Sequence, residues 1–339
     1  MAVVTGNNCL RLLHASADLE IECLPGGYNV VSVARKNARL FVLRQRVLTT
    51  YPVGLIRQIF AIKGPSYTCD EIARDEDPAY VQASLESDLF AYFAPEDFVS
   101  KRILDFGCGS GASTMVLSRL LPKSAILGVE LDPQLLSIAR ARAQFYSFPQ
   151  ENLLQSPSGK ELPDGLGKFD FVVLSAVFEH MLPDERASVL GQVWSVLRDG
   201  GYLFLNQTPH RFTPVETHTT ALPLINYLPQ PMALATARWF SRGVDRNESW
   251  ETLLRRGIRG STEYEIMRRL RRCEGGKPIL LKPSRNGVRD RIDLWRKVSG
   301  QRLPAIKNAM WVLLKALKRC SGITFVPTLS LAILKSPRN

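Results

Sequence analysis

Long apolar stretches are missing from this chain, and so is a leader of the secretory type. A run of about 18 uncharged apolar residues would be needed to predict a membrane-spanning helix, and none occurs. The longest charge-free apolar run, Ala221 to Ala237, contains prolines that would break such a helix. The opening residues lack a basic segment followed by an apolar core, so we expect no secretory signal.

Cysteine and histidine are both scarce. The 6 cysteines form no C-x-x-C pair, and Cys108 lies inside a glycine-rich loop, which excludes a disulfide framework and a zinc-finger pattern. This cysteine usage favours a reducing, cytoplasmic compartment. Only 4 histidines are present, so few imidazoles are available to accept a proton near neutral pH.

Acidic residues are depleted from the last third of the chain. Residues 207–339 hold 25 of the 44 Lys and Arg but only 9 of the 32 Asp and Glu, whereas residues 1–206 are slightly acidic. A basic third predicts contact with an anionic partner, such as a phosphate, a sugar nucleotide, a lipid headgroup or RNA. A solvated basic face that keeps the protein in solution is the alternative.

Strand-like and helix-like runs alternate from Lys101 onward. Apolar runs at 103–104, 125–129, 152–155, 169–174 and 202–205 predict strands, and helical spacing at 113–121, 133–146 and 184–197 predicts helices between them. This alternation is typical of a doubly wound α/β sheet with parallel strands. Since ligands bind at the carboxyl ends of the strands in such sheets, the functional residues should follow the strands.

The rest of the chain is predicted to fall into distinct parts around this core. They are an N-terminal extension with a possible hairpin unit over 1–70, the core over 71–206, a basic insertion that covers the site over 207–302, and a C-terminal helix with two strands over 303–339. In the extension, Pro25-Gly26-Gly27 predicts a hairpin turn between 19–24 and 28–33, and 39–43 predicts a further strand. A helix is expected at 88–98.

Towards the C-terminus the signals are weaker. One helix is predicted at 262–272 within the insertion, and two strands are predicted at 323–326 and 329–334. The helix predicted at 305–320 carries Trp311 and several leucines beside lysines. We expect this helix to pack on the sheet, with peripheral membrane contact as the alternative.

The sharpest local pattern is the glycine loop Asp105-Phe106-Gly107-Cys108-Gly109-Ser110-Gly111. Glycines let the backbone turn sharply and approach a ligand, and the helix that follows presents free N–H groups. The stretch also fits the dinucleotide pattern. Asp105 would repel a pyrophosphate but suits the cationic sulfonium of S-adenosylmethionine, and Glu130, at the end of the next strand, can hold ribose hydroxyls.

Four segments in this order resemble the class I S-adenosylmethionine-dependent methyltransferases, in particular the ubiquinone-biosynthesis O-methyltransferases and the glycan-cluster methyltransferases. They are ILDFGCGSGAST at 103–114, GVELDP at 128–133, FDFVVLSAVFEHMLPDE at 169–185 and LRDGGYLFLNQTP at 197–209. The resemblance implies a seven-stranded Rossmann-like sheet with a C-terminal antiparallel hairpin. It also implies that S-adenosylmethionine is the cofactor of the core.

The same resemblance assigns residues to that cofactor. They are Asp105, Phe106, Gly107, Cys108, Gly109, Gly111, Glu130, Leu131, Ser158, Ser175 and Ala176. The glycine loop would hold the methionine part, Glu130 the ribose and Leu131 the adenine. Ser158 stands where an Asp usually binds the adenine amino group, so a hydroxyl or backbone contact is expected there instead.

Metal and base assignments follow from the segment after the fourth strand. The ubiquinone-type enzymes carry a Glu-x-x-Glu-His set that binds a divalent metal, and here those positions read Ala176, Glu179 and His180. Because one ligand is missing, we predict that no metal is required. Transfer to a hydroxyl needs a base, for which imidazole is suited. We rank His180, oriented by Glu179, ahead of His218 and then His210; Glu179-His180 could instead cap the next helix.

The leading functional hypothesis is O-methylation of a small or lipid-linked acceptor that is glycan-like or phenol-like and anionic. Arginines at 268, 269, 271 and 272 could clamp an anionic acceptor, or form a solvated face. An RNA methyltransferase that grips through its basic third is a second hypothesis, although no RNA-binding module is evident. A non-catalytic cofactor- or anion-binding protein on the same fold is a third. We expect a cytoplasmic protein, with peripheral contact at the inner face of a membrane as a possibility.

Overall fold

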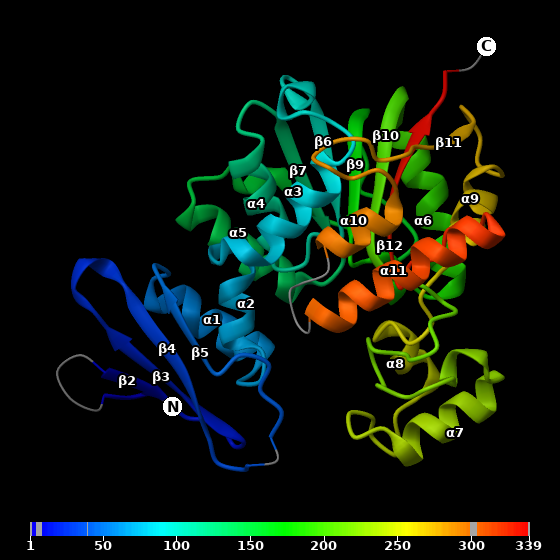
Figure 1. Cartoon of the computed structure of the whole chain (residues 1–339). Coiled ribbons are helices and arrows are strands. Elements are labelled where there is room, and N and C mark those ends of the chain that lie inside the picture. The colour runs from blue at the N-terminus through cyan, green and yellow to red at the C-terminus, as the bar shows by residue number, and fades with distance from the viewer. Residues whose placement is uncertain (1, 5–8, 39, 299–303, 338–339) are drawn as a thin grey trace.

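The computed structural model describes residues 2–4, 9–38, 40–298 and 304–337 (Figure 1). The described residues contain an antiparallel sheet of five strands near the N-terminus and a mixed sheet of seven strands in the remainder. Helices α1 (Val53–Lys63) and α2 (Thr68–Glu76) lie between the two sheets, as Figure 1 shows in blue. Within the described residues, no helix combines the length and apolarity that crossing a bilayer demands.

The hairpin predicted around Pro25-Gly26-Gly27 is confirmed in the N-terminal sheet. The strands of this sheet are, in order, β1 (Ala2–Val4), β2 (Cys9–Leu12), β3 (Ala17–Cys23), β4 (Asn29–Arg35) and β5 (Arg46–Thr49). In the hairpin, Leu19 of β3 lies opposite Val33 of β4, and both are buried. The strand predicted at 39–43 is wrong over its described residues: Leu40 and Val42 do turn inward, but the edge that could pair is taken by β5.

Helices α1 and α2 connect the N-terminal sheet to the core. Ile56 and Ile72 from these helices share an apolar cluster with Leu19 of the sheet and Ile138 of α5 (Pro133–Phe145). The next helix, α3 (Ala83–Phe90), shows that the helix predicted at 88–98 is wrong in extent. It ends at Phe90, and Pro95 begins a separate short turn because proline cannot continue a helix.

The doubly wound sheet predicted for the core is confirmed. Its strands are β6 (Arg102–Phe106), β7 (Ala125–Glu130), β8 (Leu153–Gln155), β9 (Phe169–Ser175), β10 (Leu197–Pro209), β11 (Pro278–Leu280) and β12 (Thr328–Lys335). Their order is β11-β12-β10-β9-β6-β7-β8, and β6 to β10 are mutually parallel where they pair. The helices α4 (Ala112–Leu120), α5 and α6 (Pro183–Val196) connect the parallel strands.

The strands of this sheet bury side chains on both faces. Leu104, Val172 and Leu205 belong to one apolar cluster. Their neighbours Ile103, Phe171 and Phe204 belong to another, because successive side chains of a strand point to opposite faces. This two-sided burial explains why the core strands are recognisable as apolar runs in the sequence.

The C-terminal part differs from its prediction. The antiparallel edge of the sheet is present, but β12 pairs there with β11, which comes from within 207–302. The strand predicted at 323–326 is absent; instead Pro327, which has no N–H, accepts a hydrogen bond from the His210 backbone. The insertion is also more helical than predicted, with α7 (Gln230–Phe240), α8 (Trp250–Arg255), α9 (Glu263–Leu270) and α10 (Arg291–Val298).

The long helix α11 (Pro304–Ser321) lies on the surface, so the expectation that it packs on the sheet is wrong for most of its length. Only Leu314 of this helix is buried. It is attached mainly to α10, where Trp311 donates a hydrogen bond to Asp293 and Lys315 forms an ion pair with Asp290. Figure 1 shows α11 in orange-red beside α10.

Candidate active site

A cavity of about 510 Å³ opens at the carboxyl ends of the parallel strands. Most of the residues that the sequence assigned to a site line it together. These are Phe106, Gly107, Cys108, Gly109, Glu130, Leu131, Ser158, Ser175, Ala176, His180 and His218. The walls therefore combine the glycine loop, the end of β7, the turn after β9 and three residues of the segment 207–302, namely Gln207, His218 and Arg255.

The glycine loop is fitted closely between two strands. The backbone N–H groups of Gly107 and Cys108 donate to the carbonyl oxygen of Val129 at 2.8 and 3.0 Å. Gly107 has φ of +72°, and a Cβ atom at this position would lie 2.6 Å from a methyl carbon of Val177. Gly109, at φ +59°, has open space on its Cβ side. Position 107 thus requires glycine because Val177 lies so close to it. At position 109, the absence of a side chain leaves room for a ligand.

Glu130 closes the loop from the neighbouring strand. One carboxylate oxygen accepts from the N–H of Gly109 at 2.8 Å, and the other accepts from the N–H of Asp132 at 2.9 Å. The side chain lies at the cavity wall. Since each carboxylate oxygen can accept a second hydrogen bond, Glu130 keeps capacity for two hydroxyl donors from a ligand.

Asp105 and Gly111 lie behind the loop and are not among the residues that line the cavity. Asp105 is almost fully buried and accepts hydrogen bonds from the hydroxyls of Ser113 and Thr114, each at 2.7 Å. Burial raises the pKa of Asp105 to about 6, with those hydroxyls acting in the opposite direction. Gly111 starts α4 at φ +84°, and a Cβ there would lie 2.8 Å from Ala139 of α5.

Comparison with known proteins bears on what this cavity binds. Residues 104–203 match the family model described as a methyltransferase domain. The demethylmenaquinone methyltransferase of Thermus thermophilus is 31% identical over 109 residues, covering 32% of this chain and 48% of that protein. The mitochondrial ubiquinone biosynthesis O-methyltransferase of Saccharomyces cerevisiae is 31% identical over 146 residues, covering 42% and 41%. Residues 104–203 therefore form a methyltransferase domain.

Solved structures of methyltransferases are more distantly similar to this chain. The structure of PKMT2 from Rickettsia typhi in complex with AdoHcy aligns at 15% identity and a TM-score of 0.44, covering 76% of this chain and 53% of that one. The chain spans about half the length of the curated relatives that it matches.

Residues that the sequence did not indicate reach the methyltransferase cavity from α1 and α2. Lys63, Glu71 and Arg74 line it, next to Ser110 of the glycine loop. Their positions could not be inferred from a local pattern, because the helices that carry them precede the domain by several elements. Lys63 belongs to the part predicted as an extension, whereas Glu71 and Arg74 lie at the start of the predicted core.

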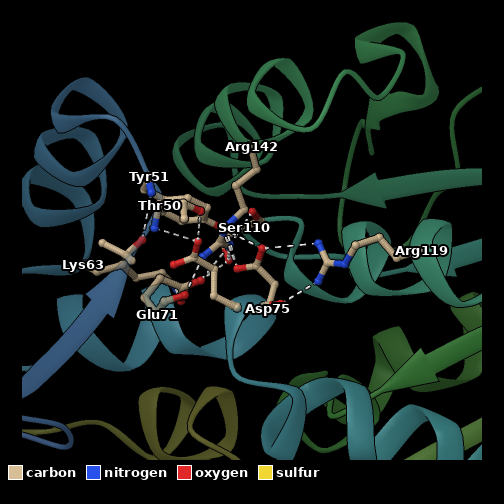
Figure 2. Close-up of polar contacts among 10 residues, drawn as sticks. Thr50, Tyr51, Lys63, Glu71, Asp75, Ser110, Arg119 and Arg142 are labelled. Atoms are coloured by element: carbon tan, nitrogen blue, oxygen red, sulfur yellow. Dashed lines mark hydrogen bonds and ion pairs between the residues drawn. The ribbon is translucent and has the colours of Figure 1, made fainter. Parts of the chain in front are cut away.

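A buried network fixes this wall to the domain, as Figure 2 shows. Arg142 of α5, fully buried, donates to the carbonyl oxygen of Ser110 at 2.8 Å and pairs with Glu71 at 2.9 Å. Its Nε atom lies 3.3 Å from Asp75, and Tyr51 also donates to Asp75 at 2.6 Å. Burial acts to raise the pKa of Glu71, but the guanidinium of Arg142 outweighs it and lowers the pKa to about 2.

Two of the predicted histidines lie together in the domain's cavity. His180 follows β9, and its ring centre lies 5.3 Å from that of His218 in the insertion. The Nδ1 atom of His180 lies 2.7 Å from the carbonyl oxygen of Arg255. Glu179 is fully buried, with one oxygen 3.8 Å from His180 Nε2 and the other accepting from the hydroxyl of Thr208 at 3.1 Å. Burial raises the pKa of Glu179, an effect that His180 opposes.

His210 lies apart from this group. Its ring packs against Phe325 with ring centres 4.5 Å apart, and it lines a different cavity together with Tyr264 and Arg271. Burial lowers the pKa of His210 to about 4. The other arginines predicted as a clamp are not among the residues lining the methyltransferase cavity, and Arg269 pairs with Glu265 of its own helix at 3.1 Å.

Proposed function

We propose that this protein transfers a methyl group from S-adenosylmethionine to a hydroxyl group of a small acceptor. The observation that carries the proposal is the contact between Glu130 and Gly109, which places a carboxylate and a bare stretch of backbone on the same cavity wall. A phosphate-free nucleoside fits this wall, because a carboxylate holds ribose hydroxyls and would repel a pyrophosphate. The methyltransferase match over 104–203 supports the same cofactor.

Methyl transfer requires the protein mainly to align the two reactants. The sulfonium of the cofactor already activates the methyl group, so the site must hold the acceptor oxygen in line with it and help remove its proton. Glu179, His180 and His218 form the cluster that can assist this removal, since both histidines line the same cavity as the glycine loop. His218 brings the insertion into the site, as a segment that contacts the acceptor should.

A lipid-linked or membrane-held acceptor is supported by the surface of α11. Ile306, Met310, Leu313 and Leu317 recur every three or four positions and are all exposed, so they share one outward helix face. The helix belongs to the basic third of the chain, which favours anionic surfaces. We propose that this face rests on an anionic membrane and brings the cavity to its acceptor.

Calorimetry with S-adenosylmethionine, S-adenosylhomocysteine and NAD tests the cofactor assignment. We expect both methionine-derived ligands to bind the wild type and the Glu130→Ala variant to bind them roughly 10- to 100-fold more weakly, because it loses hydrogen bonds to a charged group. Glu151→Ala, which alters an exposed carboxylate outside the cavity lining, should bind like the wild type. Tight binding of NAD without any response to the methyl donor would overturn the proposal.

Transfer itself is tested with a labelled methyl group. The wild type, supplied with labelled S-adenosylmethionine, is offered phenolic, glycan and lipid-linked hydroxyl acceptors, with an RNA oligonucleotide as a fourth class. Label in a hydroxyl acceptor supports the proposal. Label in the RNA alone contradicts the acceptor class while leaving the cofactor assignment intact.

A further inference from the structure

Three side chains beside the cavity could together bind a metal ion, a role that the proposed reaction does not give them. The donor atoms of Glu179, His180 and His218 all lie within 4.8 Å of one another. We propose that they bind one divalent cation of the zinc type, with His218 of the insertion as the third ligand. The proposal deepens the proposed function, since it specifies how the cluster acts on the acceptor hydroxyl.

The buried carboxylate is the first observation that points to a ligand. The Oε1 atom of Glu179 has no hydrogen-bond partner among the described residues, although the side chain is fully buried. Leaving a buried charged oxygen unpaired is costly, and such atoms normally have a partner or a metal. The other oxygen is held by Thr208, so the carboxylate is fixed in place with Oε1 on the side of His180.

His180 is set in the tautomer that a metal requires. Its Nδ1 atom faces the carbonyl oxygen of Arg255 at 2.7 Å. A carbonyl can only accept, so Nδ1 carries the proton, and Nε2 of the neutral ring has a free lone pair on the side of Glu179. A metal-binding histidine typically donates its other N–H to a carbonyl or carboxylate in this way, which fixes the ring.

The insertion is shaped to bring His218 to the same point. Glu216, which is buried, accepts from the backbone N–H groups of His218, Thr219 and Thr220 at 2.6 to 3.1 Å and thereby fixes the turn. A Cβ on Gly257 would lie 2.6 Å from the His218 ring and 3.3 Å from the Glu179 side chain. Residues 255–257 therefore lie against all three side chains, and glycine at position 257 allows the close approach.

The donor types select the metal. Two imidazoles and one carboxylate make a set known from catalytic zinc sites, whereas Mg²⁺ prefers oxygen ligands and water. Metal–ligand bonds of about 2.0 to 2.2 Å would require the donors to approach one another by roughly 1 Å. A cation at this wall lowers the pKa of a hydroxyl bound to it, so it would assist the acceptor directly. His180 then acts as a ligand and not as the proton acceptor that the sequence predicted.

Metal binding is measured on the full chain without cofactor or acceptor. The protein is stripped with a chelator and titrated with Zn²⁺, Co²⁺ and Mg²⁺, with calorimetry, elemental analysis and the visible absorption of Co²⁺ as readouts. We expect one Zn²⁺ or Co²⁺ per chain, and no competition from Mg²⁺ at millimolar concentration. His218→Ala and Glu179→Gln should each weaken binding by at least about 10- to 100-fold.

His210→Ala is the matched control, because His210 lines another cavity and should leave the affinity unchanged. Unchanged Zn²⁺ affinity in His218→Ala, or equal binding of Mg²⁺, overturns the proposal. The circular dichroism of His218→Ala should match the wild type, because His218 is exposed. S-adenosylmethionine binding is measured separately on the metal-stripped wild type, which separates a failure of the metal site from a failure of the proposed function.

Discussion

The guanidinium of Arg142 donates a hydrogen bond to the backbone carbonyl oxygen of Ser110 at 2.8 Å. This contact joins the last turn of α5 to the glycine loop of the methyltransferase domain. The same guanidinium pairs with Glu71 on α2, so one buried side chain fixes both the loop and the wall next to it (Figure 2). The shape of the methyltransferase cavity depends on the N-terminal part of the chain through this residue.

We therefore predict that Arg142→Met destabilises the protein and weakens S-adenosylmethionine binding together. Removing Arg142 takes the buried cation from Glu71 and Asp75 and leaves them only the longer pairs with Lys63 and Arg119, at a cost of roughly 3 to 5 kcal/mol. Urea unfolding gives the stability change and calorimetry the affinity. Arg140→Met, on the exposed side of the same helix, should change neither by much. A folded Arg142→Met protein with wild-type affinity would contradict the prediction.

Gly107 offers a separate test of the loop geometry. An alanine here must adopt positive φ and also place its Cβ against both methyl carbons of Val177. We expect Gly107→Ala to lose roughly 2 to 4 kcal/mol of unfolding free energy, combining left-handed strain with overpacking. Gly165→Ala shares the positive φ but has no atom within 4 Å, so it isolates the strain.

In a Val177→Ala background, Gly107→Ala should lose less unfolding free energy than it does in the wild type, whereas the loss for Gly165→Ala should stay the same. Both pairs are measured by urea unfolding, and cofactor affinity is followed alongside. Equal losses for the two glycine variants would mean that the close approach to Val177 is not what requires glycine at position 107.

The sequence predicted the core well because its signals are local. The run Phe169 to Leu174 reads as a buried strand since both of its faces are covered, and Asp132 caps α5 as its position before Pro133 indicates. Glu130 and the glycine loop meet because adjacent parallel strands end at the same edge. Such contacts follow from strand order alone.

Other parts of the site depend on contacts between distant segments. Lys63 reaches the cavity only because α1 packs between the N-terminal sheet and α5, and His218 only because residues 255–257 form its support. His218 is far from Glu179 in the sequence, so a local motif around Glu179 could not show that the two side chains lie close together. The edge strand β11 was missed for a related reason, since its three residues become a strand only by pairing with β12.

Asp88 should make the free energy of unfolding depend on pH. This side chain is fully buried among Leu85 and Leu89, and burial raises its pKa to about 7, with Ser330 acting in the opposite direction. The folded state then binds more protons than the unfolded state between about pH 4 and pH 7, so this group lowers stability as the pH rises through that range and no further above it.

Asp88→Asn should therefore be more stable than the wild type by roughly 2 to 4 kcal/mol at pH 8, with a smaller difference at pH 5. Urea unfolding at the two pH values measures the difference between the two proteins, which removes the contribution of all other groups. Asp164→Asn, at an exposed position, should show no pH-dependent difference. A gain for Asp88→Asn that is the same at both pH values would rule out titration as its cause.

The outward face of α11 gives the prediction that bears on the acceptor. Burying a leucine side chain in a lipid interface contributes on the order of 1 to 2 kcal/mol, so replacing two should release the protein from vesicles by well over 10-fold. We expect the full chain to sediment with phosphatidylglycerol vesicles and Leu313→Gln/Leu317→Gln to remain in solution.

Leu48→Gln alters a leucine of similar exposure on the N-terminal sheet and should bind vesicles like the wild type. Binding should also weaken with added salt, because the basic third of the chain contributes an electrostatic part that mobile ions screen. If the double variant instead changes a dimer into a monomer and leaves vesicle binding intact, the face is covered by a second copy of the chain and the membrane assignment is wrong.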